Sequence, residues 1–500
     1  MNPHRAHKPV DEFDETPIKY PSKLPAKSDG KNPHVMIVGA GVGGLFLAIL
    51  LDKAGIPYEI YERTSEVKAL GSAMSLNANI LAAFEQLGLY EEFKKIALPC
   101  QKMEIMYEDM KTIATIDISD NGLTGYEHML FSRPKLYALL ESKVPKERIH
   151  FNKKVLSMMQ NKEGVMIRCA DGTTYHGDVL VGADGAYSAV RQGLYKSLQD
   201  KNLLPEVDAK DLNKGYACLV GTTDPVDPEK YPFVKSELAT RLLTIGEGTP
   251  YTWVVYNVAE NKICYMIVCQ YKTLALAEQE KFRNSEWAPE RNADMIKAVK
   301  DFPAPCGGTM GDLINLTPAD RVSRVYLEDK IFSTWTHGRT VLIGDAAHKL
   351  LPSAGQGAIT AMQDAIILAN CLYDLESLAQ QDIQAALEDF REQRHDKVEE
   401  IYQKSKTTAA LSYGQTWIEK IMRYLVFNCL PHSAYTKNLR KETAYRPQAT
   451  FLPLAEVRGT GPVLPQKPSK RYEAELKKKA EEESETSSAA ITAVAAAAAV

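Results

Sequence analysis

The segment between His34 and Leu51 restricts the fold of this chain more than any other part of the sequence. A run of four apolar residues predicts a short buried strand, a later apolar run predicts a helix, and a glycine-rich turn separates them. The glycines of this segment are Gly39, Gly41, Gly43 and Gly44. The first, second and fourth have the spacing G-x-G-x-x-G, which permits a tight turn, close approach of the backbone to a pyrophosphate, and close packing of helix on strand. The start of the helix also offers N–H groups and a positive dipole end to phosphates.

A second strand and an acidic residue follow where such a turn requires them. The run from Tyr58 to Tyr61 predicts the strand, and Glu62 and Arg63 come directly after it. An acid about 20 residues after the turn can hydrogen-bond the ribose hydroxyls of an adenosine. The combination therefore predicts a Rossmann-like dinucleotide-binding domain of the α/β class. The alternative is a glycine-rich turn in an ordinary α/β domain that holds no ligand.

Size and composition describe a globular protein of more than one folding unit. The chain has 500 residues, of which 45% are hydrophobic and 25% are charged. A net charge of −4 gives no reason to expect a nucleic-acid partner. Eight cysteines without a C-x-x-C pair indicate reduced thiols, and no apolar run of about 18 residues predicts a transmembrane span. Since the N-terminus lacks the apolar core of a signal peptide, we expect a cytoplasmic protein, and no sequence pattern predicts a metal site.

The pattern of apolar and polar residues along the sequence predicts a discontinuous first domain. The middle of the chain alternates apolar and polar residues between prolines and glycines, as an antiparallel sheet does, whereas the flanking parts have buried strands and long helical patterns. We therefore expect a disordered arm over residues 1–33, a dinucleotide-binding domain over 34–200 and 326–405, a β-rich substrate domain over 201–325, C-terminal helices over 406–445, and a largely disordered tail over 446–500.

Two further glycine-rich segments carry chemically informative residues. They contain, in chain order, Asp184, Gly185, Ser188, Arg191, Gly344, Asp345, His348, Pro352, Gly355, Gln356 and Gly357. Each pairing of aspartate with glycine is a common turn when it stands alone. Their order and spacing after the first glycine-rich turn make them informative.

With the first turn and Glu62, these segments give the chain a resemblance to the class A flavoprotein monooxygenases, the single-component FAD-dependent aromatic hydroxylases typified by para-hydroxybenzoate hydroxylase. The resemblance spans residues 34–405. It implies an α/β, Rossmann-like FAD-binding domain with an inserted, mostly antiparallel β-sheet substrate domain and C-terminal helices. It also implies FAD as the bound cofactor and NAD(P)H as a co-substrate.

The resemblance implies a role for each matching residue. The first turn would cradle the FAD pyrophosphate and Glu62 would bind the adenosine ribose. Asp184-Gly185 would serve both FAD and NAD(P)H, and Asp345 would hydrogen-bond the ribityl chain. A glycine turn at a helix start would stabilise negative charge on the pyrimidine edge of the flavin. The full set of expected cofactor contacts is Gly39, Gly41, Gly43, Gly44, Glu62, Arg63, Gly71, Ser72, Arg133, Asp184, Gly185, Arg191, Gly344, Asp345, Pro352, Gly355, Gln356 and Gly357.

Three residues leave alternatives open, and a fourth departs from the family pattern. Arg133 would lie beside the phosphate and ribityl part of the cofactor, or it is a surface arginine at a helix start. Arg191 would contact the cofactor or form a structural ion pair. His348 is a better candidate for ordering its loop than for acid–base catalysis, and the sequence identifies no catalytic residue. Ile359 stands where the family commonly has asparagine, which removes one polar contact near the flavin.

The implied reaction is the hydroxylation or epoxidation of a small aromatic, polyketide-like or terpenoid molecule of secondary metabolism, with NAD(P)H and O2, through a flavin C4a-hydroperoxide. A halogenase or a reductase on the same scaffold is one alternative, although the chain lacks the Trp-x-Trp-x-Ile-Pro segment of a halogenase. A non-enzymatic dinucleotide-fold protein is another, and the intact flavin motifs argue against it. The sequence does not specify the substrate, the choice between NADH and NADPH, or the oligomeric state.

Two sets of apolar residues remain ambiguous. Tyr216, Trp253, Tyr256 and Tyr265 have strand spacing in the expected substrate domain, where they are substrate contacts or plain core. Residues 417–430 mix apolar and basic side chains. This segment either lies on a membrane surface or packs on the protein body as a helix.

Overall fold

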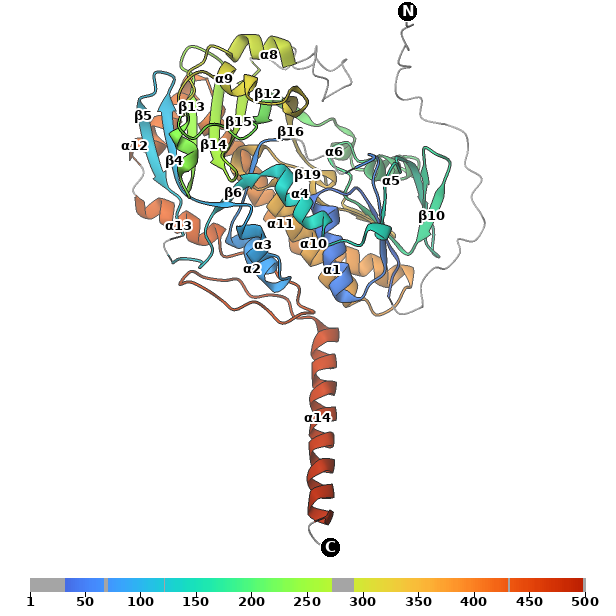
Figure 1. The fold of residues 1–500 in the computed structure, drawn as a ribbon. Coiled ribbons are helices and arrows are strands. Elements are labelled where there is room, and N and C mark those ends of the chain that lie inside the picture. The colour runs from blue at the N-terminus through green and yellow to red at the C-terminus, as the bar shows by residue number, and fades with distance from the viewer. Residues whose placement is uncertain (1–31, 67–70, 121, 272–291, 430–431, 498–500) are drawn as a thin grey trace, which may run out of the picture.

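The computed structural model describes residues 32–66, 71–120, 122–271, 292–429 and 432–497. Nearly all of the arm expected over residues 1–33 therefore lies outside the described residues. The body combines a nucleotide-type α/β part with a large second sheet, and a long C-terminal helix projects away from it (Figure 1). This architecture confirms the expected fold class.

The first sheet is the one that the glycine-rich turn predicts. Its strand order is β17-β18-β11-β1-β2-β7, and all neighbours are parallel except the β17–β18 pair. Every residue of β1 and β11 is buried, as expected for central parallel strands covered on both faces. The strands are β1 (Val35–Val38), β2 (Tyr58–Tyr61), β7 (Ile149–His150), β11 (Val179–Gly182), β17 (Thr336–His337) and β18 (Thr340–Leu342).

A small antiparallel sheet lies beside the first one. It has the order β10-β9-β8, with β8 (Val155–Gln160), β9 (Val165–Cys169) and β10 (Thr174–Gly177). The Asp171-Gly172 turn joins β9 to β10, and Gly172 has a φ of 82° there.

The large sheet has ten strands and is mostly antiparallel. Its order is β19-β16-β12-β15-β14-β13-β4-β6-β3, and β5 pairs with β4. Strands β3 to β6 precede residue 201, so this sheet also takes in a segment that the sequence analysis assigned to the first domain. The strands are β3 (Ala73–Leu76), β4 (Leu98–Tyr107), β5 (Thr112–Asp117), β6 (Met129–Ser132), β12 (Asn213–Thr222), β13 (Ala239–Ile245), β14 (Tyr251–Val258), β15 (Lys262–Gln270), β16 (Ser323–Ile331) and β19 (His348–Lys349).

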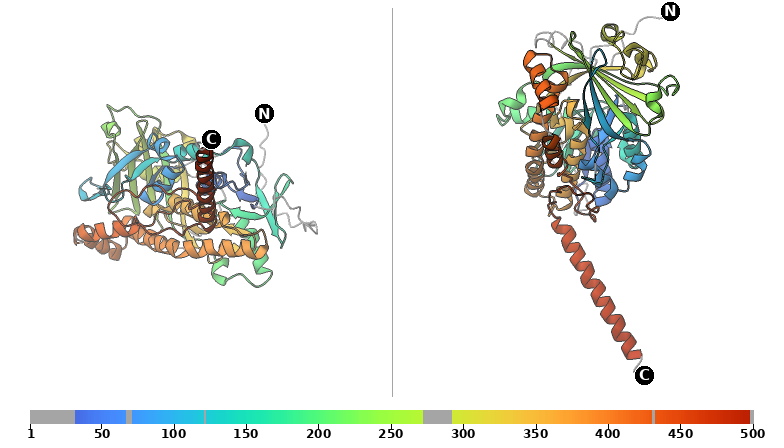
Figure 2. Two further views of the ribbon diagram at one scale, coloured as in Figure 1. Left: turned by 90° about the horizontal axis from the view of Figure 1, so that it is seen from below. Right: turned by 90° about the vertical axis from the view of Figure 1, so that its left-hand side faces the viewer.

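Helices cover the first sheet and join it to the large one. The apolar helix α1 packs along α10, and α11 passes from α10 to the large sheet (Figures 1 and 2). The helices are α1 (Val42–Ala54), α2 (Ala78–Gln86), α3 (Tyr90–Lys94), α4 (Arg133–Glu141), α5 (Ala189–Gln199), α6 (Glu206–Ala209), α8 (Asn292–Val299), α9 (Met310–Asn315), α10 (Gly357–Tyr373), α11 (Gln380–Tyr413), α12 (Trp417–Cys429), α13 (His432–Glu442) and α14 (Lys470–Ala497).

Helix α12 packs on the protein body, as one of the two interpretations of the sequence predicts. Buried Arg423 donates to the carbonyls of Leu411 and Gly414, so one side of the helix packs on the body. Its other side exposes large apolar side chains, with Trp417 72% exposed. The others are Ile418, Ile421, Met422, Tyr424 and Leu425. We call these six residues the α12 apolar face.

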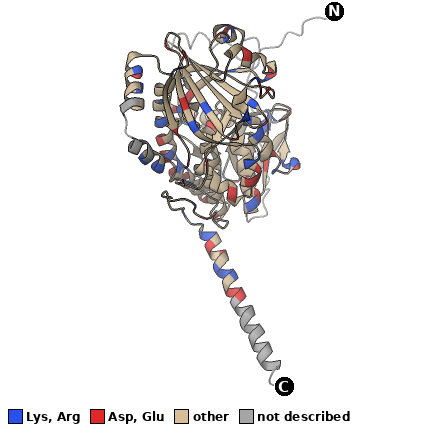
Figure 3. Ribbon diagram, turned by 60° about the vertical axis from the view of Figure 1, so that its left-hand side comes forward, with Lys and Arg blue, Asp and Glu red and all other residues tan. Residues whose placement is uncertain are grey.

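The C-terminal segment differs from the expected disordered tail. Ala449 and Phe451 are buried in the main hydrophobic core. The side-chain amide of Gln86 in α2 donates to the Ala449 carbonyl at 2.8 Å and accepts from the Ala449 N–H at 2.9 Å. Beyond this segment α14 projects from the body, and lysine and glutamate alternate along its described part (Figure 3). Of the helices described, none is both long enough and apolar enough to span a bilayer.

Candidate active site

The glycine-rich turn between β1 and α1 has the geometry that its spacing predicts. Gly39 has a φ of 105°, and a Cβ placed there would lie 2.5 Å from the Ala183 carbonyl oxygen. A Cβ at Gly44 would lie 2.1 Å from the Gly39 oxygen. Only glycine fits these two positions, because one needs a left-handed backbone and the other lets helix and strand touch.

The two remaining glycines of this turn have different surroundings. A Cβ at Gly41 would meet only the Ala183 oxygen at 3.8 Å, so the space above this N-cap is open. No side chain caps α1, which leaves its first N–H groups available to an anion. Gly43 instead faces α10, where a Cβ would lie 3.4 Å from that of Ala361. Its lack of a side chain serves packing of α1 on α10.

Glu62 closes the turn from the end of β2. Its Oε2 accepts a 2.9 Å hydrogen bond from the Ala40 N–H, and its Oε1 accepts from the Thr64 N–H, also at 2.9 Å. The carboxylate is thereby held at the loop where an adenosine ribose would lie in a dinucleotide-binding fold. Arg63 is exposed at the same edge of the sheet.

Gly71, Ser72 and Arg133 lie together where β3 begins and β6 ends, at the edge of the large sheet. The Arg133 N–H donates to the Ser72 carbonyl at 3.1 Å, and a Cβ at Gly71 would lie 3.1 Å from Arg133 Cδ. The Arg133 guanidinium donates to the Tyr137 hydroxyl at 2.9 Å. Tyr137 and, more weakly, Asp345 raise the pKa of Arg133. Arg133 is therefore not a bare surface arginine, because it lies within electrostatic range of the Gly344-Asp345 turn.

Asp184 lies beside the first glycine-rich turn and caps α5. A Cβ at Gly39 would lie 2.9 Å from Asp184 Cα, and Asp184 Oδ2 accepts from the Ala189 N–H at 2.7 Å. Burial raises the pKa of this carboxyl group. Its Oδ1 is buried and has no hydrogen-bond partner among the described residues. Gly185 follows with a φ of 85° and open space where a Cβ would point.

Arg191 connects the Asp184-Gly185 loop with the Gly344-Asp345 loop, which are both predicted to contact the cofactor. Its Nη1 donates to the Ala346 carbonyl at 2.9 Å, its Nη2 donates to the Ala186 carbonyl, and its guanidinium lies 4.1 Å from the centre of the Phe332 ring. Both of these hydrogen bonds go to backbone carbonyls, and no ion pair of Arg191 is found among the described residues. The predicted cofactor contact stays a prediction. Arg191 is a positioning residue for the turns on either side of it.

A buried polar network holds the Gly344-Asp345 turn. Asp364 Oδ2 accepts from the Gly344 N–H at 2.9 Å and lies 2.6 Å from His348 Nε2. Asp364 Oδ1 accepts from Arg394 Nε at 2.7 Å. Burial alone would raise the pKa of Asp364, but His348 and Arg394 hold it below its usual value. His348 is 1% exposed, which supports the loop-ordering interpretation.

The Pro352 to Gly357 loop meets the start of α10. Gly355 has a φ of 64°, and a Cβ there would lie 3.3 Å from Ser75 Oγ of β3. Helix α10 begins at Gly357 without a side-chain cap, so its first N–H groups are available to negative charge. Ile359 is 1% exposed in the main core, so it packs the helix and leaves the loop surface to the backbone.

The four aromatic residues of the large sheet lie on opposite faces. Trp253 and Tyr265 belong to a core cluster with residues of α8 and α9, on the outer face. Tyr256 lies on the inner face, which packs toward β6 and α11, and Tyr216 contacts Tyr413 of α11 with ring centres 5.8 Å apart. Trp253 and Tyr265 are 1% and 0% exposed, which supports the core interpretation for these two residues.

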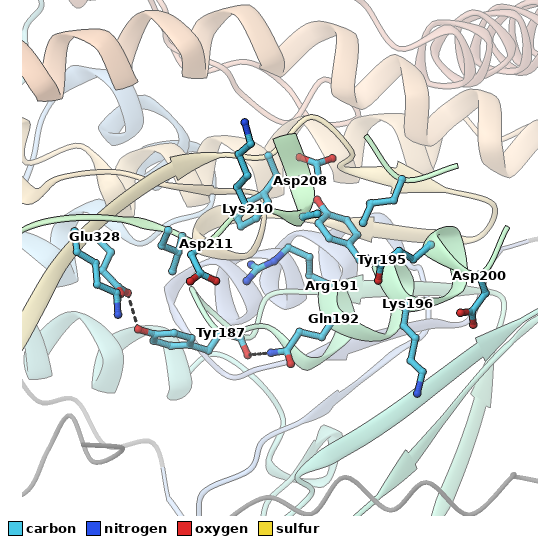
Figure 4. Close-up of a pocket in the computed structure, with 16 residues that line it drawn as sticks. Tyr187, Arg191, Gln192, Tyr195, Lys196, Asp200, Asp208, Lys210, Asp211 and Glu328 are labelled. Carbon is cyan, nitrogen blue, oxygen red and sulfur yellow. Dashed lines mark hydrogen bonds and ion pairs between the residues drawn. The ribbon is translucent and has the colours of Figure 1, made fainter. Parts of the chain in front are cut away.

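A separate polar cavity of about 680 Å³ lies next to the Asp184-Gly185 turn (Figure 4). It lies between α5 and the segment from Leu204 to Lys214, and the predicted cofactor residues contribute only Arg191 to its lining. Figure 4 shows Tyr187 at one end, bonded to Glu328 of β16 at 2.7 Å. The sequence analysis did not predict this cavity, because most of its lining comes from the segment between Gln192 and Lys214, which carries no motif.

Comparisons with known proteins agree with this geometry. The family model described as FAD binding domain matches residues 32–211 and 307–405. The FAD-dependent monooxygenase ptmM of Penicillium ochrochloron is 30% identical over 389 residues, 75% of this chain and 87% of the relative. The FAD-dependent monooxygenase ausM of Emericella nidulans is 27% identical over 446 residues, 86% of this chain and 88% of the relative.

Solved structures share the fold. Klebsiella pneumoniae HpxO, complexed with FAD and uric acid, superposes with a TM-score of 0.66 at 21% identity, over 83% of this chain and 97% of that one. The 2,6-dihydroxypyridine-3-hydroxylase of Arthrobacter nicotinovorans superposes with a TM-score of 0.62 at 19% identity, over 78% of this chain and 95% of that one. The fold and the glycine-rich site define a flavoprotein of the class A monooxygenase type. The chain belongs to the FAD binding domain family, and it is an FAD-dependent monooxygenase.

The residues present fit FAD. The open space above Gly41 and the uncapped starts of α1 and α10 supply a cradle for its phosphates and ring. The unpartnered buried oxygen of Asp184 can accept a hydrogen bond from a hydroxyl group of the cofactor. Arg394, which the sequence analysis missed, supports this cradle through Asp364. It lies on α11, far along the chain from the Gly344-Asp345 motif, and a lone arginine in an amphipathic helix gives no sequence signal.

Proposed function

We propose that this monooxygenase uses NAD(P)H and O2 to hydroxylate or epoxidise a small organic molecule, aromatic, polyketide-like or terpenoid. The observation that carries the proposal is the contact between the cofactor loop and the inner face of the large sheet. Thr222 of β12 donates from its hydroxyl to the Gly71 carbonyl at 3.3 Å. A molecule on the inner face would therefore lie close to the flavin.

Bound FAD would supply the redox chemistry, and the protein would position it and exclude water. Gly39, Gly41 and Gly44 would hold the pyrophosphate, and the α10 start would stabilise negative charge on the ring. Fungal relatives named FAD-dependent monooxygenases, such as penM of Penicillium crustosum, support this activity class. The uric acid complex of HpxO shows a small substrate on a related fold.

The cavity beside Asp184-Gly185 is our candidate for the approach of NAD(P)H. Tyr187 is 50% exposed there and offers an aromatic face to a base or a nicotinamide ring. Lys196, Lys210 and Lys214 line the same cavity and can meet phosphates, although acidic residues lie among them. Tyr187→Ala should raise the KM for NAD(P)H and leave the FAD content unchanged. An unchanged KM would contradict this placement.

The α12 apolar face supports a contact with a membrane surface. Six large apolar side chains on one side of a helix are unusual on a free protein surface, and Trp417 suits a bilayer interface. The seven cysteines with described side chains are free thiols, which supports a reducing compartment such as the cytoplasm. Apolar substrates would be drawn from the same surface.

The decisive experiment follows the oxygen atom. The purified protein should carry a flavin spectrum, and the correct substrate should accelerate NAD(P)H oxidation. Labelled O2 should place one labelled atom in the product. Oxygen from water, or a product that gains only electrons, would replace the monooxygenase with a reductase. Halide incorporated into the product would indicate a halogenase, and a colourless protein would indicate a non-enzymatic binding protein.

A further inference from the structure

The chain between α13 and α14 crosses the body as a long loop beneath α2 (Figure 1). We call residues 443–469 the C-terminal strap. The strap bonds three helices that are far apart in the sequence. Its Ala449 N–H donates to Gln86 of α2, its Gln448 carbonyl accepts from α10, and its Lys467 pairs with Asp389 of α11 at 2.7 Å. These helices lie directly behind the predicted cofactor loops, so the strap can affect the loops without contacting FAD.

Tyr445 is the strap residue that lies nearest to the buried network of Asp364. Its carbonyl accepts from Asn79 Nδ2 of α2 at 3.0 Å, and the Asn79 carbonyl in turn accepts from Gln363 Nε2 of α10 at 3.1 Å. The backbone of Tyr445 is thereby fixed to α2, and α2 is fixed to α10. From this anchored position the Tyr445 ring lies against the Arg394 guanidinium, with the ring centre 5.5 Å from the guanidinium carbon.

The Tyr445 ring compensates part of the burial of Arg394. The arginine side chain is 0% exposed, and its Nη1 is buried without a hydrogen-bond partner among the described residues. Burial alone would lower the pKa of Arg394, but Tyr445 and Asp364 hold it above its usual value. A cation gains more from an aromatic face when it is desolvated than when it is exposed. The ring therefore favours the guanidinium orientation in which Arg394 Nε donates to Asp364 at 2.7 Å.

Asp364 connects this orientation with the Gly344-Asp345 turn. Its Oδ2 accepts from the Gly344 N–H at 2.9 Å, and a Cβ at Gly344 would lie 3.0 Å from that of Ala361. The turn thus rests directly on α10, two turns or less from the uncapped start of this helix at Gly357. A displacement of Asp364 would therefore change both the turn and the helix start that are predicted to meet the cofactor.

A site that binds through backbone N–H groups gains affinity when the free protein already holds them in the binding geometry. When a smaller fraction of molecules holds that geometry, the apparent Kd rises by the inverse of the fraction. We propose that Tyr445 is a positioning residue for FAD. Its ring holds Arg394 against Asp364, and this contact keeps the Gly344-Asp345 turn and the start of α10 in the FAD-binding geometry. The proposal concerns FAD alone and depends neither on the substrate nor on NAD(P)H.

Dilution of the purified holoenzyme tests the proposal, because released FAD is detected by its fluorescence and the dilution series gives its Kd. Tyr445→Leu removes the ring but keeps the backbone carbonyl that Asn79 binds, and it should raise the Kd for FAD about three- to tenfold. Tyr445→Met should do the same, since it also replaces the ring with a flexible apolar side chain. Tyr445→Phe keeps the ring face and should bind FAD within about twofold of wild type.

The matched control is another aromatic residue of the same strap. Phe451 is 3% exposed and stacks on Tyr373, at the opposite end of α10 from the cofactor loops. Phe451→Leu should lower the Tm at least as much as Tyr445→Leu, because it leaves a cavity in the core. Its Kd for FAD should nevertheless stay within about twofold of wild type, because the Asp364 network is intact.

Three results would overturn the proposal. An unchanged Kd for FAD in Tyr445→Leu and Tyr445→Met would make Tyr445 a structural residue only. An equal loss of FAD affinity in Phe451→Leu would show that any weakening of the strap loosens the cofactor. A Tyr445→Phe variant as weak as Tyr445→Leu would assign the effect to the hydroxyl group and exclude the ring.

Discussion

Replacing Arg394 with methionine should destabilise the FAD-binding part of the protein strongly. Arg394 and Asp364 are both 0% exposed and are joined at 2.7 Å. Removing one partner of a buried pair leaves an uncompensated charge, at a cost of about 3 to 5 kcal/mol. Each kcal/mol lost from the free energy of unfolding lowers the Tm of a domain of this size by about 2 to 4 °C. The Tm should therefore fall by roughly 6 to 20 °C.

The matched control lies one turn away on the same helix. Arg391 pairs with Glu388 at 2.8 Å, but the two side chains are 31% and 45% exposed. Exposed pairs of this spacing contribute about 0.5 kcal/mol or less, so Arg391→Met should change the Tm by about 2 °C or less. Thermal unfolding of the FAD-free protein, followed by circular dichroism at pH 7, measures both variants. Equal effects of the two substitutions would refute the reasoning.

The pH dependence gives the same experiment a second readout. The folded state lowers the pKa of Asp364, so its contribution to stability is present above the unfolded pKa of about 3.9 and is lost as the pH falls through the folded value. Without Arg394 the carboxyl group protonates more readily. The stability difference between wild type and Arg394→Met should therefore be largest near pH 7 and shrink toward pH 4. A difference that grows on acidification would contradict this assignment of charges.

Three further perturbations test other parts of the structure. Gly41→Val should fold but lose FAD, because its side chain meets no protein atom closer than 3.8 Å at Cβ and fills the phosphate space; a folded variant with stoichiometric flavin would contradict the cradle. Asp345→Ala should weaken FAD retention more than it lowers the Tm of the FAD-free protein, since a cofactor contact acts through ligand binding; equal losses with and without FAD would assign Asp345 to the fold alone. Ile421→Lys with Leu425→Lys should reduce co-sedimentation with phosphatidylcholine vesicles without changing the Tm, and unaltered sedimentation would exclude the α12 apolar face as the contact.

The sequence predicted the cofactor turns because their chemistry is local. At Gly39 and Gly44 a left-handed backbone and a close helix contact require glycine, and the structure has both. The strand before the turn and the acid at Glu62 follow from period and spacing in the same way. Gly43 carries no such local requirement, and its neighbour on α10 is distant in sequence, so its packing role was not visible.

Long-range packing explains what the sequence did not predict. Residues 446–452 belong to the segment that was expected to be a largely disordered tail, yet Phe451 stacks on Tyr373 with ring centres 4.9 Å apart. The strands β3 to β6 joined the large sheet through the parallel pairing of β4 with β13, which no local pattern indicates. Arg394 likewise depends on a fold that brings α11 beside Asp364.

The inner face of the large sheet shows how the two kinds of information combine. Alternation along a strand tells which residues share a face, but it does not tell which face meets the cofactor. Trp253 and Tyr256 are three residues apart in β14 and therefore on opposite faces, and the structure places only Tyr256 toward α11.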